Sequence, residues 1–185
     1  MAIVAGDIIV GPGKLRLAPV GTDDSLIVAG AVPVWAAAWV EAGLTDDGLN
    51  LAIEKSYANH SVDQSPDWVA STITERHASI ATNLVTTTLA NLKLALNGGT
   101  ITTGANWDKF EPNSDVIAVP ETYTALAIEG NNQAGKKIIV VVRRCLSVDN
   151  VSMPFKKDAK TMYSVSWAGH FVSDTTAPFV VYTQK

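Results

Sequence analysis

The chain has 185 residues, of which 47% are hydrophobic and 17% charged, and its formal net charge is −4. This composition excludes a disordered chain, which is rich in charge and poor in apolar residues, and the length favours one domain over residues 1–185. The acidic balance argues against a general nucleic-acid or anionic-membrane binder, and a single cysteine, Cys145, excludes an internal disulfide and a Cys-rich zinc site.

Two further features concern targeting. No run of about 18 apolar residues is present, so we expect no transmembrane helix and no membrane partner. Residues 1–10 contain Asp7 and no base, unlike a secretory signal, so we expect the protein to be made in the cytoplasm.

Charge is distributed unevenly along the chain. Residues 1–70 contain nine acids and three bases, whereas residues 131–185 contain three acids and eight bases. These two ends can complement each other within one subunit or between neighbouring subunits, where charge sets orientation and encounter rate. Scattered solvated faces are the third interpretation.

Most of the chain predicts β-strands, because β-branched and aromatic residues fill segments that Gly, Pro, Asn and Asp separate. The apolar stretch 29–40, broken by Pro33, is expected to be a buried strand and loop. The continuous β-branched run 138–142 is typical of a strand covered on both faces. The predicted strands are 14–20, 73–84, 123–129, 137–144, 164–172 and 179–183.

One segment predicts a helix. Leu89, Leu92 and Leu96 recur at i, i+3 and i+7, a threonine run ending at Thr88 can supply the N-cap, and Asn97 begins an Asn-Gly-Gly stop. We therefore expect a mainly β protein, an antiparallel β-sandwich or partial barrel, with one short α-helix packed on a sheet.

The stretch 45–71 is polar and long. After Ile53 its large apolar residues are few, namely Tyr57, Val62 and Trp68. A connection of this length with little to pack is often functional. We predict a long hairpin or arm that leaves the body; an ordinary surface loop is the alternative.

The sequence contains no convincing motif for phosphate binding, metal binding or catalysis. Residues 130–137 resemble a phosphate-binding loop, but Lys137 replaces the required hydroxyl and a strand follows, so we predict a hairpin turn. His60, His77 and His170 lack ligand spacing, so we expect no metal and no cofactor. Cys145 follows two arginines that would lower its pKa if near, but a buried, idle thiol is favoured. We expect no catalytic residue and no enzyme.

A resemblance covers nearly the whole chain. Residues 17–22 (Leu-Ala-Pro-Val-Gly-Thr), the tryptophans Trp35 and Trp39, and residues 42–49 resemble the opening of major tail tube proteins of long-tailed (siphovirus-type) bacteriophages. The polar arm, the Thr-rich strand, the helix at 88–96 and a strand-rich second half follow in the same order. The likeness is one of order and pattern more than of invariant motifs.

The resemblance implies a structural virion protein of the phage tail tube fold. Subunits form rings, typically hexamers, which stack into a tail tube that encloses the tape-measure protein and conducts DNA into the host. The implied partners are the chain itself, the tape-measure protein, and the tail terminator and tail-tip proteins. DNA passes without specific binding, since a basic lining would hold phosphates, and the implied location is the tail of the virion.

Candidate site residues follow from this interpretation. Strands 54–57, 73–82, 123–129 and 138–144 are candidates for the inner barrel. The arm is expected to make contacts between rings, through Asp46, Asp47, Tyr57, His60 and Asp63. The candidate lumen acids are Glu54, Glu75 and Glu129. A basic group is expected to face acids of the next subunit and comprises Arg143, Arg144, Lys156, Lys157 and Lys160.

Two other classes of function remain open. A β-sandwich binding module for a receptor or carbohydrate would use a concave patch of exposed tryptophans. An enzyme on a β scaffold would pair Cys145 with His170. The tryptophans available to the first are Trp35, Trp39, Trp68, Trp107 and Trp167.

Overall fold

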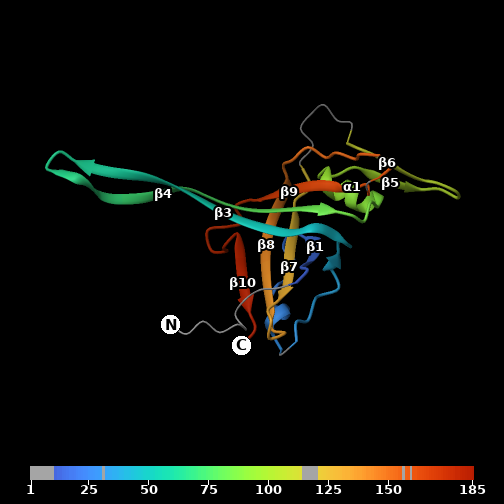
Figure 1. Ribbon diagram of the computed structural model, residues 1–185, viewed down its shortest axis with the longest axis horizontal. Helices are drawn as coiled ribbons and strands as arrows, with labels where there is room; N and C mark the ends of the chain where they lie inside the picture. Colours follow the sequence, from blue (N-terminus) through green and yellow to red (C-terminus); the bar gives the residue numbers. More distant parts are fainter. Residues whose placement is uncertain (1–10, 31, 114–120, 156, 159) are drawn as a thin grey trace.

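The computed structural model describes residues 11–30, 32–113, 121–155, 157–158 and 160–185. Over these residues the protein is mainly β, with one eight-stranded antiparallel sheet, one two-stranded sheet and one short α-helix (Figure 1). The strands of the described part do not close into a barrel. The elements in chain order are β1 (Lys14–Pro19), a 3-10 turn (Ser25–Val28), β2 (Val40–Glu41), β3 (Thr45–Val62), β4 (Ser65–Leu84), α1 (Leu89–Ala95), β5 (Thr100–Thr103), β6 (Asp108–Glu111), β7 (Thr124–Asn131), β8 (Lys137–Ser147), β9 (Tyr163–Gly169) and β10 (Phe179–Thr183).

The large sheet divides along β8. Its strand order is β2-β1-β7-β8-β9-β4-β3, and β10 pairs with β8 as well. One edge of β8 pairs with β10 over residues 138–142 and with β9 over residues 145–147. On its other edge, a bulge against β7 separates these two halves. The β9-β4-β3 part therefore crosses the β1-β7-β8 part, as Figure 1 shows.

Two buried clusters lie on opposite faces of β1, β7 and β8. In the first, Leu15 and Leu126 pack with Ile80 of β4 and Trp167 of β9. The second cluster joins Ile139 of β8 to residues of the connection between β1 and β2. The strand at 137–144 is thus covered on both faces, as its continuous apolar run predicted.

The structure confirms three local predictions: the alternation in residues 73–84, the ends of the helix and the turn at 130–137. The alternation in the second half of 73–84 holds, and its inward residues are all buried. The hydroxyl of Thr88 accepts a hydrogen bond from the Asn91 backbone N–H, and Asn97 follows the helix with φ of 55°. The turn predicted over 130–137 joins β7 to β8. The inward residues of β4 are Ala78, Ile80, Thr82 and Leu84.

Other expectations were wrong. Most of the stretch 29–40 is exposed, including Val32 at 71%, and Trp39 is the only large apolar side chain of its described residues that is buried. Leu96 follows the last turn of α1 and is exposed, since Ala95 occupies the inward position. Phe171 is exposed because β9 ends at Gly169. The short strands β2, β5 and β6 were not predicted.

Replacing Ile80 by alanine tests the packing of β4 on β1 and β7. Ile80 is fully buried, so Ile80→Ala should lower the free energy of unfolding by about 3 kcal/mol in urea denaturation of dilute protein. Ile73→Ala is the matched control, because the same strand holds this isoleucine half exposed and a loss within about 0.5 kcal/mol is expected. Equal losses in the two variants would contradict this packing.

Candidate functional site: the projecting hairpin

The hairpin of β3 and β4 extends far beyond the sheet that anchors it. Its pairing runs from Thr45 opposite Leu84 in the body to Val62 opposite Ser65 at the tip. Only residues 79–84 of β4 also pair with β9. Beyond that point the hairpin is two-stranded and projects from the body (Figure 1). We call residues 54–77 the arm; it corresponds to most of the polar stretch expected to leave the body.

One face of the arm is the continuation of the core. Leu51 lies opposite Ile80 on the buried face, and the next pair on that face is Ile53 opposite Ala78. Because side chains alternate along β3, Tyr57 lies on this face farther out. Its partner Ile73 lies there too, because a bulge in β4 between Glu75 and Ile73 shifts the alternation by one residue. We call Ile53, Tyr57 and Ile73 the apolar stripe. Each of the three is about half exposed, so the stripe lacks the cover that the core face has in the body.

The opposite face of the arm is polar. Glu54 lies opposite His77, and Glu75 lies opposite Ser56. His60 Nε2 is 3.2 Å from the hydroxyl of Thr72 on the same face. In the body this face continues as the uncovered outer surface of β3, β4 and β9, which consists of small or polar side chains. These residues are Asn50, Ala52, Ser79, Ala81, Asn83, Ser164, Ser166 and Ala168.

The bases of the arm lie on the other side. Lys55 and Arg76 are directly opposite each other and share their face with the apolar stripe. The arm therefore has an acidic polar face, with Glu54 and Glu75, and a basic apolar face. Such a division favours a surface that contacts protein on one side and solvent on the other.

The tip of the arm combines apolar and acidic residues. Trp68 is 70% exposed, and Val69 next to it and Val62 at the end of β3 are exposed as well. Asp63 follows Val62 and Asp67 precedes Trp68, and neither carboxylate has an ion pair within the described residues. A large exposed indole next to free carboxylates is typical of a binding surface.

The hairpin also leaves backbone edges open. In the part of the chain that the structure describes, β3 has no neighbour on its outer edge, and β4 has none beyond β9 along residues 65–78. Unpaired N–H and C=O groups on an exposed edge can accept a strand from another chain. Bulges interrupt the pairing at three places in the outer half and limit such pairing to short segments.

The structure separates the five predicted arm residues. Tyr57, His60 and Asp63 lie on the arm, but Asp46 and Asp47 lie at its base in the body. Lys160 Nζ is 2.6 Å from Asp46, and this hydrogen bond lowers the pKa of the Asp46 carboxyl. The side-chain amide of Asn83 donates to Asp47 at 3.0 Å. Both aspartates are thus held by contacts within the subunit.

The three predicted lumen acids also separate. Glu54 and Glu75 share the polar face of the arm, whereas Glu129 is buried on β7. Burial alone would raise the pKa of Glu129, but the hydrogen bond and charge of Lys137 and the charge of Arg16 outweigh it, so the pKa lies below its usual range. A buried, doubly paired carboxylate offers no free charge to a lumen.

Most of the predicted basic group is engaged within the subunit. Arg143 pairs with Asp24 at 2.9 Å. Arg144 donates to the backbone oxygen of Phe171 at 3.0 Å, and Lys160 pairs with Asp46. Lys157 is exposed, and Lys156 lies outside the described residues. Three of the five predicted basic residues are thus engaged by acids or carbonyl oxygens of the same chain.

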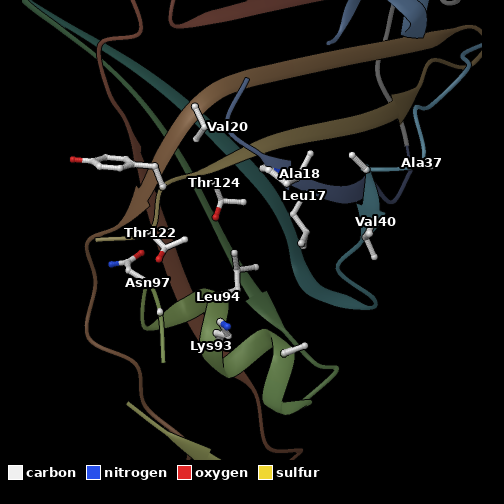
Figure 2. A pocket seen from close by; sticks show the side chains of 15 residues that line it. Leu17, Ala18, Val20, Ala37, Val40, Lys93, Leu94, Asn97, Thr122 and Thr124 are labelled. Carbon is white, nitrogen blue, oxygen red and sulfur yellow. The ribbon is translucent and has the colours of Figure 1, made fainter. Parts of the chain in front are cut away.

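A groove beside α1 was missed by the sequence analysis. Figure 2 shows it between Leu17 and Val20 at β1 and Leu94 of the helix, with Val40 at its side. Its volume is about 500 Å³, and its lining is mainly aliphatic. The lining comes from four separate segments, so no local pattern marks it. The only sequence signal is the apolar stretch 29–40, which was expected to be buried.

The tryptophans do not form one patch. Trp39 and Trp167 are buried, and Trp35 packs edge-on against Trp39 with ring centroids 5.5 Å apart. Trp68 and Trp107 are exposed, but they lie on the β3–β4 and β5–β6 hairpins, at opposite ends of the molecule in Figure 1. A concave surface of several tryptophans is therefore absent from the described part of the chain.

Cys145 does not have the chemistry of a nucleophile. Burial raises the pKa of its thiol to about 12, so the thiol is protonated at neutral pH. Its sulfur lies 3.6 Å from the Val142 backbone oxygen, while the ring of His170 packs against Tyr123.

Among the described residues, no group of three or more His, Cys, Asp or Glu side chains could hold a metal ion. None of the described helices has the length and apolar character needed to span a membrane.

Comparisons with known proteins identify no relative of this chain. No protein-family model matches this sequence, and a search of curated proteins finds no significant match. Function is therefore argued from the arm, its two faces and the groove.

The lowered pKa of Glu129 predicts a pH-dependent stability. Since the folded pKa lies below the unfolded one, the paired carboxylate stabilises the protein above the usual glutamate pKa, and this contribution is lost as pH falls through the folded pKa. Glu129→Gln should lower the free energy of unfolding by about 2 kcal/mol near pH 7, and its difference from the wild type should shrink on acidification.

Urea denaturation at a series of pH values measures this difference. Glu111→Gln is the control, because Glu111 forms an exposed pair with Lys109 and should matter little at any pH. A difference for Glu129→Gln that stays constant or grows as pH falls would contradict the assignment.

Proposed function

We propose that this chain is the structural subunit of a tail tube of a long-tailed bacteriophage. Copies assemble into rings, which stack into a tube that encloses the tape-measure protein and conducts DNA. The terminator and tail-tip proteins cap this tube in the virion. The proposed role is structural, and it needs neither a catalytic residue nor a cofactor.

The observation that carries the proposal is the uncovered core face of the arm. A two-stranded ribbon has no core of its own and is marginally stable in water. The apolar stripe, Ile53, Tyr57 and Ile73, nevertheless stays half exposed on it. Full burial of a side chain of this size contributes about 1.5–3 kcal/mol before the cost of ordering. Contact with a second copy supplies that burial, and many such contacts accumulate along a tube.

The open edges support the same interpretation. A head-to-tail contact repeats around a ring if its rotation closes and continues as a helix if it does not. Strand pairing between subunits, along β3 and the outer part of β4, would join separate sheets into one wall. Of the inner-barrel candidates, 54–57 and the first part of 73–82 lie on these exposed segments. The candidates on β7 and β8 have partners on both edges and cover on both faces.

The polar face is the part that we assign to the lumen. It presents Glu54 and Glu75 on the arm, and small side chains such as Ser79 and Ser166 on the body. Basic side chains would retain DNA through counterion release, and here Lys55 and Arg76 are on the opposite face. A smooth, weakly acidic lining suits passage of a polyanion.

Removing the arm tests its role in assembly. Glu54 and His77 lie directly opposite each other, so an Asn-Gly turn can replace residues 55–76 and close the shortened hairpin. We expect this variant to fold with the thermal stability of the monomer and to form no rings or tubes in electron micrographs.

The control trims the other hairpin. Thr103 and Asp108 are also opposite each other, so Asn-Gly can replace residues 104–107. This variant should assemble as the wild type does. Normal tube growth by the armless variant would refute the role of the arm.

Charge reversal on the polar face tests its place in the lumen. Tubes of the double variant Glu54→Lys, Glu75→Lys should retain short DNA duplexes that are protected from nuclease at low salt and released at high salt. Wild-type tubes should retain none. The control reverses two exposed acids elsewhere, Glu111 and Glu121, and any DNA that it binds should be digested. If DNA were protected from nuclease in tubes of the control but not in tubes of the double variant, the polar face would lie outside the lumen.

A further inference from the structure

The groove beside α1 is apolar, but one charged residue lies at its rim. Its floor and walls include Leu17, Val20, Val40 and Leu94. Lys93 is the sole charged residue of its lining within the described part of the chain, and Figure 2 shows it on the helix, next to Leu94. The Lys93 side chain is exposed and makes no ion pair among the described residues. An occupant of this groove should thus be apolar with an acidic neighbour.

The tip of the arm has that composition. Trp68 presents a largely exposed indole, and Val69 adds an exposed aliphatic side chain. Asp67 precedes Trp68 directly, and its backbone N–H is held by the hydroxyl of Ser65 at 3.2 Å. The tip is consequently an apolar anchor beside a carboxylate, which matches the apolar groove beside an ammonium group. Buried tryptophan anchors next to a charge pair are typical of strong interface contacts.

The tip cannot reach the groove of its own chain. Figure 1 shows the tip of the β3–β4 hairpin at one end of the long axis and α1 toward the other end. The part of β4 that pairs with β9 fixes the direction of the arm at its base. A tip that enters such a groove must therefore belong to another molecule.

We propose that the groove beside α1 is the docking site for the arm tip of a second copy of this chain, with Trp68 inserted and Asp67 paired with Lys93. The inference rests on the proposed function in that it identifies the surface that receives the arm. The contact joins two different patches, so each subunit gives one tip and receives one. Such a contact is not closed by a single pair and leads to rings or to a continuing polymer.

A disulfide between two different variants tests the occupant directly. One protein has Asp67→Cys and the other has Ala38→Cys, an exposed position in the lining of the groove. The native Cys145 is buried and does not react under mild oxidation. We expect a disulfide-linked heterodimer when the two proteins are mixed and oxidised, and far less when Ala134→Cys, in the exposed β7–β8 turn, replaces the groove partner.

Assembly by single and paired variants supplies the second readout. Trp68→Ala should raise the critical concentration for assembly at least about tenfold, whereas Trp107→Ala, which removes another exposed tryptophan, should leave it unchanged. Lys93→Glu should weaken assembly by repulsion from Asp67, and Lys136→Glu is its control on an exposed turn. The exchange Asp67→Lys with Lys93→Glu should restore assembly to within about threefold of the wild type.

The outcomes separate the inference from the proposed function. Tubes that grow normally from Trp68→Ala, with no heterodimer from the cysteine pair, would overturn the docking site and leave the tube function standing; the groove would then receive another segment or another partner. A heterodimer without tubes at any wild-type concentration would support the docking site and refute the tube function. Failure of the charge exchange, with the heterodimer formed, would overturn the Asp67–Lys93 pairing.

Discussion

The core face of β3 and β4 continues past the point where the body can cover it, and the other features of this molecule depend on that mismatch. Side chains alternate along β3, and the bulge of β4 between Glu75 and Ile73 returns Ile73 to the face of Ile80. The core face therefore reappears farther out as Ile53, Tyr57 and Ile73. Six residues of β4 pair with β9 and anchor the hairpin rigidly. The body therefore holds an apolar surface away from itself, where only another molecule can cover it.

Electrostatics sort the charges into those that hold the subunit and those that remain available. Asp46 with Lys160, Asp24 with Arg143, and Glu129 with Lys137 are ion pairs within one chain. The buried pair at Glu129 matters most for folding, because a lone charge there would be costly. Among the charges without an ion pair in the described part of the chain are Glu54 on the polar face, Asp63 and Asp67 at the tip of the arm, and Lys93 beside the groove. The surfaces that we assign to assembly therefore keep charges that no contact within the subunit neutralises.

Patterns confined to one segment could be predicted from the sequence. The alternation that ends at Leu84, the Thr88 cap and the run around Val140 each depend on neighbours in the chain, and the structure confirms them. The polar stretch 45–71 predicted an arm. The arm does not end at Ser71, however, because β4 continues unbroken from the tip of the arm into the predicted strand 73–84. Trp68 was visible there as an isolated large apolar residue.

Features that need distant segments could not be predicted. Glu129 was expected to be free because nothing nearby in sequence reveals that Arg16 would lie across from it on β1. The groove joins β1, the stretch before β2 and α1, and the exposed part of 29–40 was assigned to the core because hydrophobicity alone does not tell a buried strand from an uncovered surface. In both cases tertiary pairing, and not local propensity, decides the outcome.

The central claim is that copies of this chain complete one another. Negative-stain electron microscopy of the purified wild-type protein, over a series of rising concentrations, tests it most directly. The account predicts rings and hollow tubes above a critical concentration, with the arm bridging neighbouring subunits. Particles that remain monomeric at every concentration, with the apolar stripe still exposed, would contradict it.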